Sequence, residues 1–479
     1  MPGQGALWGP LHVERDDDEF KLFYHTYGAY PGLGQETDPR YACLATSRDG
    51  LHFERPELGR YEFNGSKQNN IIDLKTNLGG QGHGWLDARR FAPDEPPEFR
   101  YKTVFWMGPG AQGLRGHGVG FSHDGLLWRP WKDNPVVQGR NSGDVVTCAT
   151  TRDWFHPLHS APMPPSKYAL FPKTHVFING WRRRSIAVCV SDDDPASPPF
   201  TKFFDRQLAL TPDILDDDMA ADRLIAARDI LTYDNAADYR CEFYGMFVFR
   251  CGDVFLGMLW VYDASCSLER VGGKNQYALV EVQLAASRDL FHWKRLGGRL
   301  PIIPRGAPDA FDSHMIFYHT LPVEVGDEWW IYYVGHNEGH AIRNGFTPEM
   351  RDKFRAEVQA GRRFLPSIGL GRIRKEGFFS LDAGSIPAEL VTRPVVTDAP
   401  QLFLNANVAP GGHLRVELRD EAGRPLPGYS YTDCKDVAGD GVRLRVSWKV
   451  TATTPVWTGQ PVRLAFRAQN TALYGFVFA

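Results

Sequence analysis

Three acidic residues open segments that have the composition of β-strands, and their placement suggests chemistry that needs more than one carboxyl group. They are Asp144 in SGDVVT, Glu242 in RCEFYG and Asp312 in FDSHMI. Two carboxyl groups can cleave a glycosidic bond when one donates a proton to the leaving oxygen and the other acts as nucleophile or activates a water. These three residues are therefore the candidate catalytic groups.

Glu242 is the predicted proton donor among the three. It lies at the start of its strand among aromatic residues, and burial in such surroundings raises the pKa of a carboxyl group. The alternative is a structural ion pair with Arg240, two residues earlier. Asp144 and Asp312 are the candidate nucleophile or base, because their small or polar neighbours would let a sugar approach. The alternative for each is a turn aspartate that accepts hydrogen bonds from backbone N–H groups.

Other side chains are predicted to bind the substrate near these carboxyl groups. Trp8 and Tyr244 are candidates for stacking on sugar rings, although aromatic residues in strands more often pack in the core. Asp87, in DARRFAPDEPPEFR, has the simpler alternative of an ion pair with Arg89 or Arg90. The predicted substrate-binding residues are Trp8, His83, Asp87, Arg240, Tyr244, His314 and His336.

Neither a metal nor another cofactor is expected. His336 and His340 stand four residues apart in HNEGH, but the segment lacks the helical periodicity of a zinc site. The seven cysteines include no CxxC pair. They are expected to behave as small buried hydrophobic residues.

A repeated pattern organises the chain. SRDGLHFERP (47–56), SHDGLLWRPW (122–131) and SRDLFHWKRL (287–296) share a serine, a basic residue, an aspartate and an aromatic residue at matching positions, and weaker copies occur at 191–200 and 369–384. Each of the three clear copies follows a β-rich run, which predicts a strand, an Asp-led turn and an outer strand. Five such units predict a five-bladed β-propeller.

The predicted units also suggest how the chain divides. Two helices are expected, at 212–231 and 347–361, inside insertions between strands. After about residue 390, short alternating strands separated by Pro/Gly turns predict a β-sandwich. The expected fold is all-β, with a catalytic propeller at 1–388 and a C-terminal sandwich at 389–479. The propeller channel is expected to be lined by LWGPLHVE, GHGWLDARR, SGDVVTCATT, CEFYGMFVFR and FDSHMIFYH.

Composition restricts the class of partner. The 479 residues are 43% hydrophobic and 23% charged, with a formal net charge of −3, which is the balance of a soluble globular protein. No basic excess indicates nucleic acid or an anionic membrane as partner. MPGQGALWGP lacks the pattern of a signal peptide, so the expected location is cytoplasmic, or secreted or periplasmic if an upstream signal has been removed. The oligomeric state stays open.

Several segments together resemble bacterial proteins related to glycoside hydrolase families 32 and 43. They are the repeated blade endings, YEFNGSKQNNII (61–72), PIIPRGAPDAFDSHMI (301–316), GDEWWIYYVG (326–335) and the tail from LVTRPVV to LRVELRDEAGRPLPGY. The resemblance implies a five-bladed propeller with carboxylates at the inner ends of its channel strands. It also aligns Glu242 with the acid/base element of family 32. Two elements of that family are missing, because LWGPLHVE lacks the nucleophilic aspartate and the chain has no RDP transition-state element.

The expected function is hydrolysis of glycosidic bonds in an oligo- or polysaccharide, with furanosides such as arabinan or fructan as the family-level expectation. Two alternatives remain open. A glycoside phosphorylase of similar fold would need Arg182, Arg183, Arg184 and Arg240 to converge on phosphate. A propeller that binds sugar without catalysis would fit the missing first-strand aspartate. The nature of the sugar, the linkage and the stereochemical outcome are not indicated by the sequence.

Overall fold

A computed structural model gives the architecture of the chain. Strands make up 51% and helices 10% of it, which confirms the prediction of a mostly β protein. The chain forms two compact units: unit 1 contains Met1–Val323 and Ile331–Gly371, and unit 2 contains Glu324–Trp330 and Arg372–Ala479. The structure describes residues 7–16, 18–27, 40–63, 65–74, 81–88, 92–108, 115–139, 142–152, 166–360, 366–449 and 457–479.

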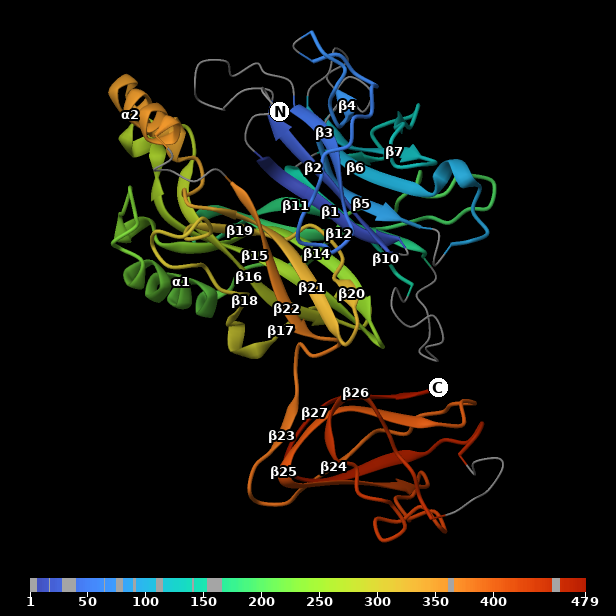
Figure 1. Cartoon of the computed structure of the whole chain (residues 1–479). Helices are drawn as coiled ribbons and strands as arrows, with labels where there is room; N and C mark the ends of the chain where they lie inside the picture. The colour runs from blue at the N-terminus through green and yellow to red at the C-terminus, as the bar shows by residue number, and fades with distance from the viewer. Residues whose placement is uncertain are drawn as a thin grey trace. The chain divides into compact units, whose positions relative to one another are not determined.

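Three antiparallel sheets form the first half of unit 1 (Figure 1). The first contains β1 (Leu7–Asp16), β2 (Glu19–Tyr27), β3 (Arg40–Ser47) and β4 (Ile71–Leu74). The second contains β5 (Gln81–Asp87), β6 (Tyr101–Met107), β7 (Gly116–Ser122), β8 (Arg129–Pro130) and β9 (Val137–Gln138). The third contains β10 (Ser142–Thr150), β11 (Tyr168–Ile178), β12 (Trp181–Val190) and β13 (Gln207–Leu210).

A single nine-stranded sheet follows along the chain, where the sequence predicted two separate blades; its residues 324–325, 328–330 and 372–374 belong to unit 2. Its strands are β14 (Arg240–Cys251), β15 (Val254–Ser267), β16 (Gln276–Ser287), β17 (Lys294–Arg295), β18 (Pro301–Ile303), β19 (Met315–Phe317), β20 (Val323–Val325), β21 (Glu328–His336) and β22 (Ser367–Arg374). The two halves are joined by one parallel pairing, Val280 with Met315. The number of blades is therefore not fixed by the count of sheets.

The strands that open the successive sheets lie next to one another. β5 lies against both β1 and β10, and β10 lies against β14. The first sheet also meets the chain that follows β19, because the Val13 amide donates to Thr320 Oγ1 at 2.9 Å. The four segments β1, β5, β10 and β14, all predicted as channel strands, therefore follow each other in space as they do in sequence.

The repeated Ser-x-Asp turns have one shared geometry. In each clear copy the serine hydroxyl accepts from the backbone amide three residues later, at 2.9 Å, and the aspartate accepts from two further amides. The residue that follows the aspartate has positive φ, which glycine adopts without strain, and it is Gly50 or Gly125 in two copies but Leu290 in the third. Leu290 is buried, so its packing offsets that strain.

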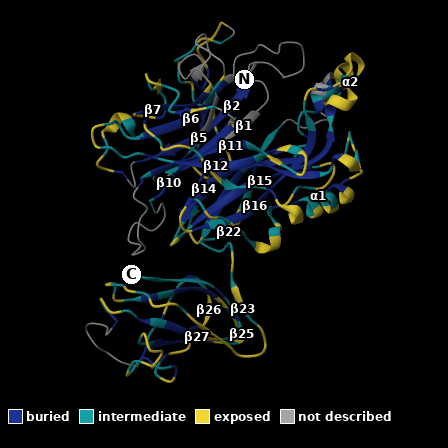
Figure 2. Cartoon of the chain, turned by 180° about the vertical axis from the view of Figure 1, so that it is seen from behind, coloured by how far each residue is buried: buried dark blue, intermediate teal, exposed yellow. Residues whose placement is uncertain are grey.

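Both predicted helices are present in unit 1. α1 covers Ile214–Ala226 and begins with a capping box between Asp213 and Asp216. α2 covers Pro348–Gln359, preceded by Thr347, whose hydroxyl accepts from the Met350 amide. Short 3-10 turns occupy Pro97–Phe99, Ala236–Asp238, Leu268–Val271, Gly297–Arg299 and Ile342–Gly345. Figure 2 shows buried residues concentrated along the strands, whereas exposed residues lie on α1, on α2 and in the loops.

A buried ionic network ties α1 to the nine-stranded sheet. Arg223 Nε lies 2.7 Å from Asp263 Oδ2 and 3.3 Å from Glu281 Oε1. Burial raises the pKa of both carboxyl groups, and the charge of Asp263 adds to the effect on Glu281. Two buried carboxyl groups thus share this guanidinium, and their mutual repulsion disfavours the doubly ionised state.

Replacing Glu281 by glutamine should change how stability depends on pH. A carboxyl whose pKa is raised on folding binds its proton more tightly in the folded state than in the unfolded state. The free energy of unfolding therefore decreases as the pH rises and this carboxyl loses its proton. We expect Glu281→Gln to be as stable as the parent or more stable by on the order of 1 kcal/mol at pH 7.5. That difference should vanish below about pH 4 in urea unfolding experiments, where the carboxyl is protonated in both the folded and the unfolded state. Glu57→Gln, at an exposed position, is the control, and a clear loss of stability at pH 7.5 for Glu281→Gln alone would contradict the account.

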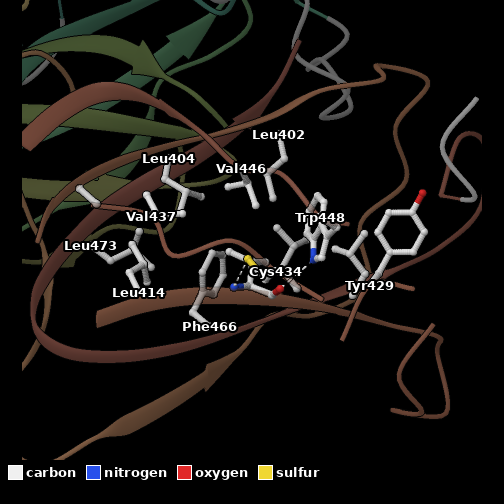
Figure 3. Packing of buried hydrophobic residues seen from close by; sticks show 14 of the residues in the cluster. Leu402, Leu404, Leu414, Tyr429, Cys434, Val437, Val446, Trp448, Phe466 and Leu473 are labelled. Carbon is white, nitrogen blue, oxygen red and sulfur yellow. Dashed lines mark hydrogen bonds between the residues drawn. The ribbon is translucent and has the colours of Figure 1, made fainter. Parts of the chain in front are cut away.

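Unit 2 contains one five-stranded sheet among its described residues. Its strands are β23 (Leu381–Ala383), β24 (Ala388–Val391), β25 (Leu402–Arg419), β26 (Gly439–Arg445) and β27 (Arg463–Phe478). Alternate residues of β25 and β27 point to one face and pack against Trp448, Tyr429 and Cys434 (Figure 3). Trp448 Nε1 donates to the Val416 carbonyl at 2.9 Å. The predicted boundary between residues 388 and 389 falls inside this unit, after β23.

The cysteines lie mostly in the interior of the protein. Six of the seven cysteines are buried and Cys251 is half-buried, all as free thiols, which agrees with their expected role as small hydrophobic residues. Within the described ranges, no helix is long and apolar enough to cross a membrane.

Candidate active site

The three candidate carboxyl groups differ sharply in exposure. The side chain of Asp144, at the start of β10, is 63% exposed. Glu242, at the start of β14, has no exposed surface, and Asp312, just before β19, is 7% exposed. Asp144 is thus the candidate that solvent reaches most readily.

Glu242 is held by two arginines. Arg184 Nη1 donates to Glu242 Oε2 at 2.6 Å, and Arg240 Nε donates to Glu242 Oε1 at 3.0 Å. Burial disfavours the carboxylate, but the charges of Arg184 and Arg240 together outweigh it, and the pKa of Glu242 lies below its ordinary value. The expectation that the pKa of Glu242 lies above its ordinary value is therefore wrong, because the contacts with the arginines outweigh burial, and the ion pair with Arg240 that the sequence offered as an alternative is present.

Asp144 is paired with a buried lysine. Lys173 Nζ, on β11, donates to Asp144 Oδ1 at 2.6 Å and lies 4.1 Å from the centre of the Tyr244 ring. Burial lowers the pKa of Lys173 to about 8, although the charge of Asp144 opposes this shift. Asp144 is therefore not simply a turn residue, since its carboxylate carries the counter-charge of a buried ammonium group.

Tyr244 belongs to a group of aromatic side chains. Its ring stacks on that of Tyr262 with an interplanar angle of 10° and 5.4 Å between ring centres. Its hydroxyl lies 3.0 Å from His340 Nε2, and the Tyr262 hydroxyl lies 3.0 Å from His340 Nδ1. The Tyr244 ring thus already contacts Tyr262 and Lys173, while its role in stacking on a sugar stays a prediction.

Arg184 connects the two carboxylates through the aromatic pair. Its guanidinium lies 4.6 Å from the centre of the Tyr262 ring and 5.5 Å from that of Tyr244. It also donates to Gln276 Oε1 at 2.6 Å. We call this continuous set the Asp144–Glu242 cluster; its members are Asp144, Lys173, Arg184, Arg240, Glu242, Tyr244, Tyr262, Gln276 and His340.

The charges of this cluster do not cancel. Lys173, Arg184 and Arg240 supply three cations, whereas Asp144 and Glu242 supply two anions. His340 is neutral, because burial and the nearby charge of Arg184 lower its pKa to about 3. The cluster therefore favours groups that carry or develop negative charge.

Asp312 has a separate set of neighbours. Its Oδ2 accepts from the Tyr333 hydroxyl at 2.7 Å, and the Tyr333 ring stacks on Phe311 with an interplanar angle of 17°. Asp144 and Glu242 are thus linked through Lys173, the Tyr244 ring and Arg184, whereas the contacts of Asp312 form a second polar group. The prediction that all three carboxyl groups lie within about 5 to 10 Å of one another stays a prediction.

The predicted substrate-binding residues have varied surroundings. Asp87 pairs with Arg100 at 3.3 Å, while Arg89 and Arg90 lie outside the described residues. Arg240 lies 4.1 Å from the centre of the Trp181 ring. The side chains of Trp8 and His83 also lie outside the described residues.

The two remaining histidine candidates are engaged with the protein. His314 Nδ1 lies 2.8 Å from Ser313 Oγ, and its Nε2 lies 3.1 Å from the Ile230 carbonyl. His336 packs edge-on against Phe317, and burial with the charge of Arg343 lowers its pKa to about 3. Of the part of the chain that the structure describes, no group of three His, Cys, Asp or Glu side chains is placed to hold a metal ion.

Three members of the cluster escaped sequence reasoning: Lys173, Tyr262 and Gln276. Lys173 directly follows the apolar residues YALFP in β11, which is a signal for a buried charge that needs a partner. Tyr262 and Gln276 carry no such signal, because they resemble ordinary residues of a core strand and its end.

Comparison with known proteins gives only distant likenesses. No family model and no curated protein matches the sequence. A glycosyl hydrolase from Bacteroides ovatus has 11% identity and a TM-score of 0.41, over 70% of this chain and 83% of that one. A family 32 β-fructofuranosidase from Bombyx mori has 9% identity and a TM-score of 0.39, over 99% and 92%. A β-1,2-mannobiose phosphorylase from Listeria innocua has 13% identity and a TM-score of 0.38, over 70% and 88%. Similarity at this level does not identify the fold, reaction or substrate of this chain, so its function must be inferred from its own residues.

Proposed function

We propose that the chain is a carbohydrate-active enzyme that hydrolyses glycosidic bonds, with the Asp144–Glu242 cluster as its active site. The observation that carries this proposal is the exposed carboxylate of Asp144, which is held at 2.6 Å by a buried lysine beside a stacked tyrosine pair. A carboxylate positioned in this way is suited to attack or stabilise an anomeric carbon. The aromatic and hydrogen-bonding groups around it suit a sugar.

The proposed architecture is a five-bladed propeller in unit 1, followed by a β-sandwich in unit 2. Five blades follow if the nine-stranded sheet is counted as two, divided at its single pairing between β16 and β19. The junction of the two domains is proposed between Gly371 and Arg372, where unit 1 ends, and not near residue 388, which lies in β24 of unit 2. An experimental structure with six or more blades, or with unit 2 completing a blade, would contradict this architecture.

Within this site we assign different roles to the two carboxylates. Asp144 acts as the nucleophile, because it reaches solvent. Glu242 is a positioning residue that fixes Arg184 and Arg240, because it is fully buried and its lowered pKa keeps it ionised at neutral pH. Asp312 remains a candidate for a second carboxylate that contacts the sugar.

A glycoside phosphorylase is the second candidate, and the excess of one cation in the cluster favours it. Arg184 and Arg240 do converge, although on Glu242. Arg183 turns away and pairs with Asp217 at 2.6 Å. We expect these pairings to leave hydrolysis as the main reaction, because the two guanidiniums are already neutralised in part.

The test is to measure cleavage of a set of aryl glycosides and oligosaccharides with and without inorganic phosphate, together with binding of the same sugars by calorimetry. Hydrolysis that is independent of phosphate supports the proposal. Turnover that requires phosphate and yields a sugar phosphate would establish the phosphorylase instead. Binding without turnover of any sugar would identify a non-catalytic sugar-binding protein.

A further inference from the structure

The Asp144–Glu242 cluster lacks an obvious proton donor among its acids. Glu242 is ionised at neutral pH and has no exposed surface. His340 has a pKa of about 3 and so carries no extra proton at neutral pH. Cleavage of a glycosidic bond with a poor leaving group nevertheless needs protonation of the leaving oxygen. Lys173, with a pKa of about 8, and the tyrosine hydroxyls are the groups of the cluster that still carry a transferable proton at neutral pH.

The hydrogen bonds around His340 define its tautomer. The Tyr262 hydroxyl donates to the Gln276 carbonyl at 2.9 Å, which uses its only proton. His340 Nδ1 lies 3.1 Å from the same carbonyl, an acceptor without a proton, so Nδ1 must be the protonated nitrogen. Nε2 of the neutral ring is then an acceptor, and the Tyr244 hydroxyl donates to it at 3.0 Å. This arrangement fixes the orientation of the Tyr244 hydroxyl.

Two cations lie beside the Tyr244 ring. Lys173 Nζ lies 4.1 Å and the Arg184 guanidinium 5.5 Å from the centre of the ring. A phenolate formed as the proton leaves would face both positive charges. Lys173 also donates to Asp144 Oδ1 at 2.6 Å, so one ammonium group contacts both the candidate nucleophile and the Tyr244 ring.

We propose that the Tyr244 hydroxyl is the proton donor of this active site, an inference that rests on the proposed glycosidase function. In the complex with substrate the Tyr244 hydroxyl turns from His340 Nε2 to the leaving oxygen. The Asp144 carboxylate attacks the anomeric carbon, the bond from that carbon to the leaving oxygen breaks with its electron pair going to the oxygen, and that oxygen takes the Tyr244 proton. Water then cleaves the ester with Asp144, its hydroxide going to the anomeric carbon and its proton to the phenolate. The residues return to their starting state.

The experiment compares Tyr244→Phe with the parent enzyme on two substrates that share one sugar. One carries a poor leaving group, such as an alkyl alcohol, and the other an activated dinitrophenol. Loss of a general acid costs about 10²- to 10⁴-fold for the poor leaving group, whereas the activated substrate needs little protonation and should lose less than about 10-fold. Tyr262→Phe is the matched control, because it removes the hydroxyl at the other side of His340; any loss it causes should be equal for both substrates.

The outcomes separate the inference from the function on which it rests. Equal losses on both substrates for Tyr244→Phe, or no loss on either, would overturn the role of Tyr244 while leaving the glycosidase in place. A parent enzyme that cleaves no glycoside would overturn the proposed function and this inference with it.

A second measurement covers the case in which Tyr244→Phe does not fold. Incorporation of 3-fluorotyrosine at position 244 keeps the hydroxyl and makes the phenol more acidic. The basic limb of the pH profile of kcat/KM should move to lower pH, because that limb reports ionisation of the proton donor. If the basic limb does not move, it reports the ionisation of another group, such as Lys173, and the proposal is overturned.

Discussion

Glu242→Gln is expected to destabilise unit 1 by about 3 to 5 kcal/mol, one of the largest effects of any conservative substitution in the chain. Glutamine fits the space but removes the charge that compensates Arg184 and Arg240, and Arg240 is 1% exposed. Urea unfolding at pH 7 measures the loss. Glu269→Gln, at an exposed position, is the matched control and should change stability by less than about 0.5 kcal/mol.

The pH dependence of this variant gives an independent check. A carboxyl whose pKa is lowered on folding stabilises the protein above its ordinary pKa near 4.3, and this contribution is lost as the pH falls through the lowered value. The parent should therefore lose part of its advantage over Glu242→Gln on acidification below about pH 4. A variant as stable as the parent at pH 7 would show that the buried charges of the two arginines do not need Glu242 to compensate them.

Asp144→Asn is expected to reduce turnover of glycosides by at least about 10²- to 10⁴-fold. The amide keeps the shape of the side chain but cannot act as a nucleophile. It also removes the counter-charge of the buried Lys173 ammonium, so some loss of stability is expected, smaller than that of Glu242→Gln because Asp144 itself is largely exposed. Steady-state kinetics on the substrates that the parent cleaves measures the effect. Asp133→Asn, at another exposed aspartate, should retain the activity of the parent.

Gly143→Ala tests the same pair without removing a charge. A methyl group at this position would overlap Lys173 Cε, so the ammonium must move relative to Asp144. We expect kcat to fall by about 10- to 100-fold, since displacement of a positioned group by about 1 Å can cost that much. A variant with full activity would show that the contact between Lys173 and Asp144 is not needed for turnover.

The structure could be predicted from the sequence wherever it depends on contacts between residues that are near one another in the chain. The Ser-x-Asp turns at Ser47, Ser122 and Ser287 depend on hydrogen bonds within three residues, and all three have the predicted form. Helix α1 was similarly predictable, because Asp213 caps it locally. The joining of β16 to β19 was not, because it depends on a single pairing between residues 35 positions apart, Val280 and Met315.

The candidate site shows the same difference between contacts that are local in sequence and contacts between distant residues. Arg240 is two residues from Glu242 and was foreseen as its partner, whereas Arg184 is 58 residues away and reverses the expected pKa shift. His340 meets Tyr244 across 96 positions. Such contacts between neighbouring sheets follow from the tertiary arrangement, and no spacing along the chain encodes them.

The most direct test of the proposed active site compares the parent with Asp144→Asn on a broad set of aryl glycosides in phosphate-free buffer. Release of the aryl group is followed by absorbance, and circular dichroism shows that both proteins are folded. The account predicts that the parent hydrolyses at least one glycoside and that Asp144→Asn does so at least about 100-fold more slowly. Equal rates for the two proteins, or no hydrolysis of any glycoside by the parent, would contradict it.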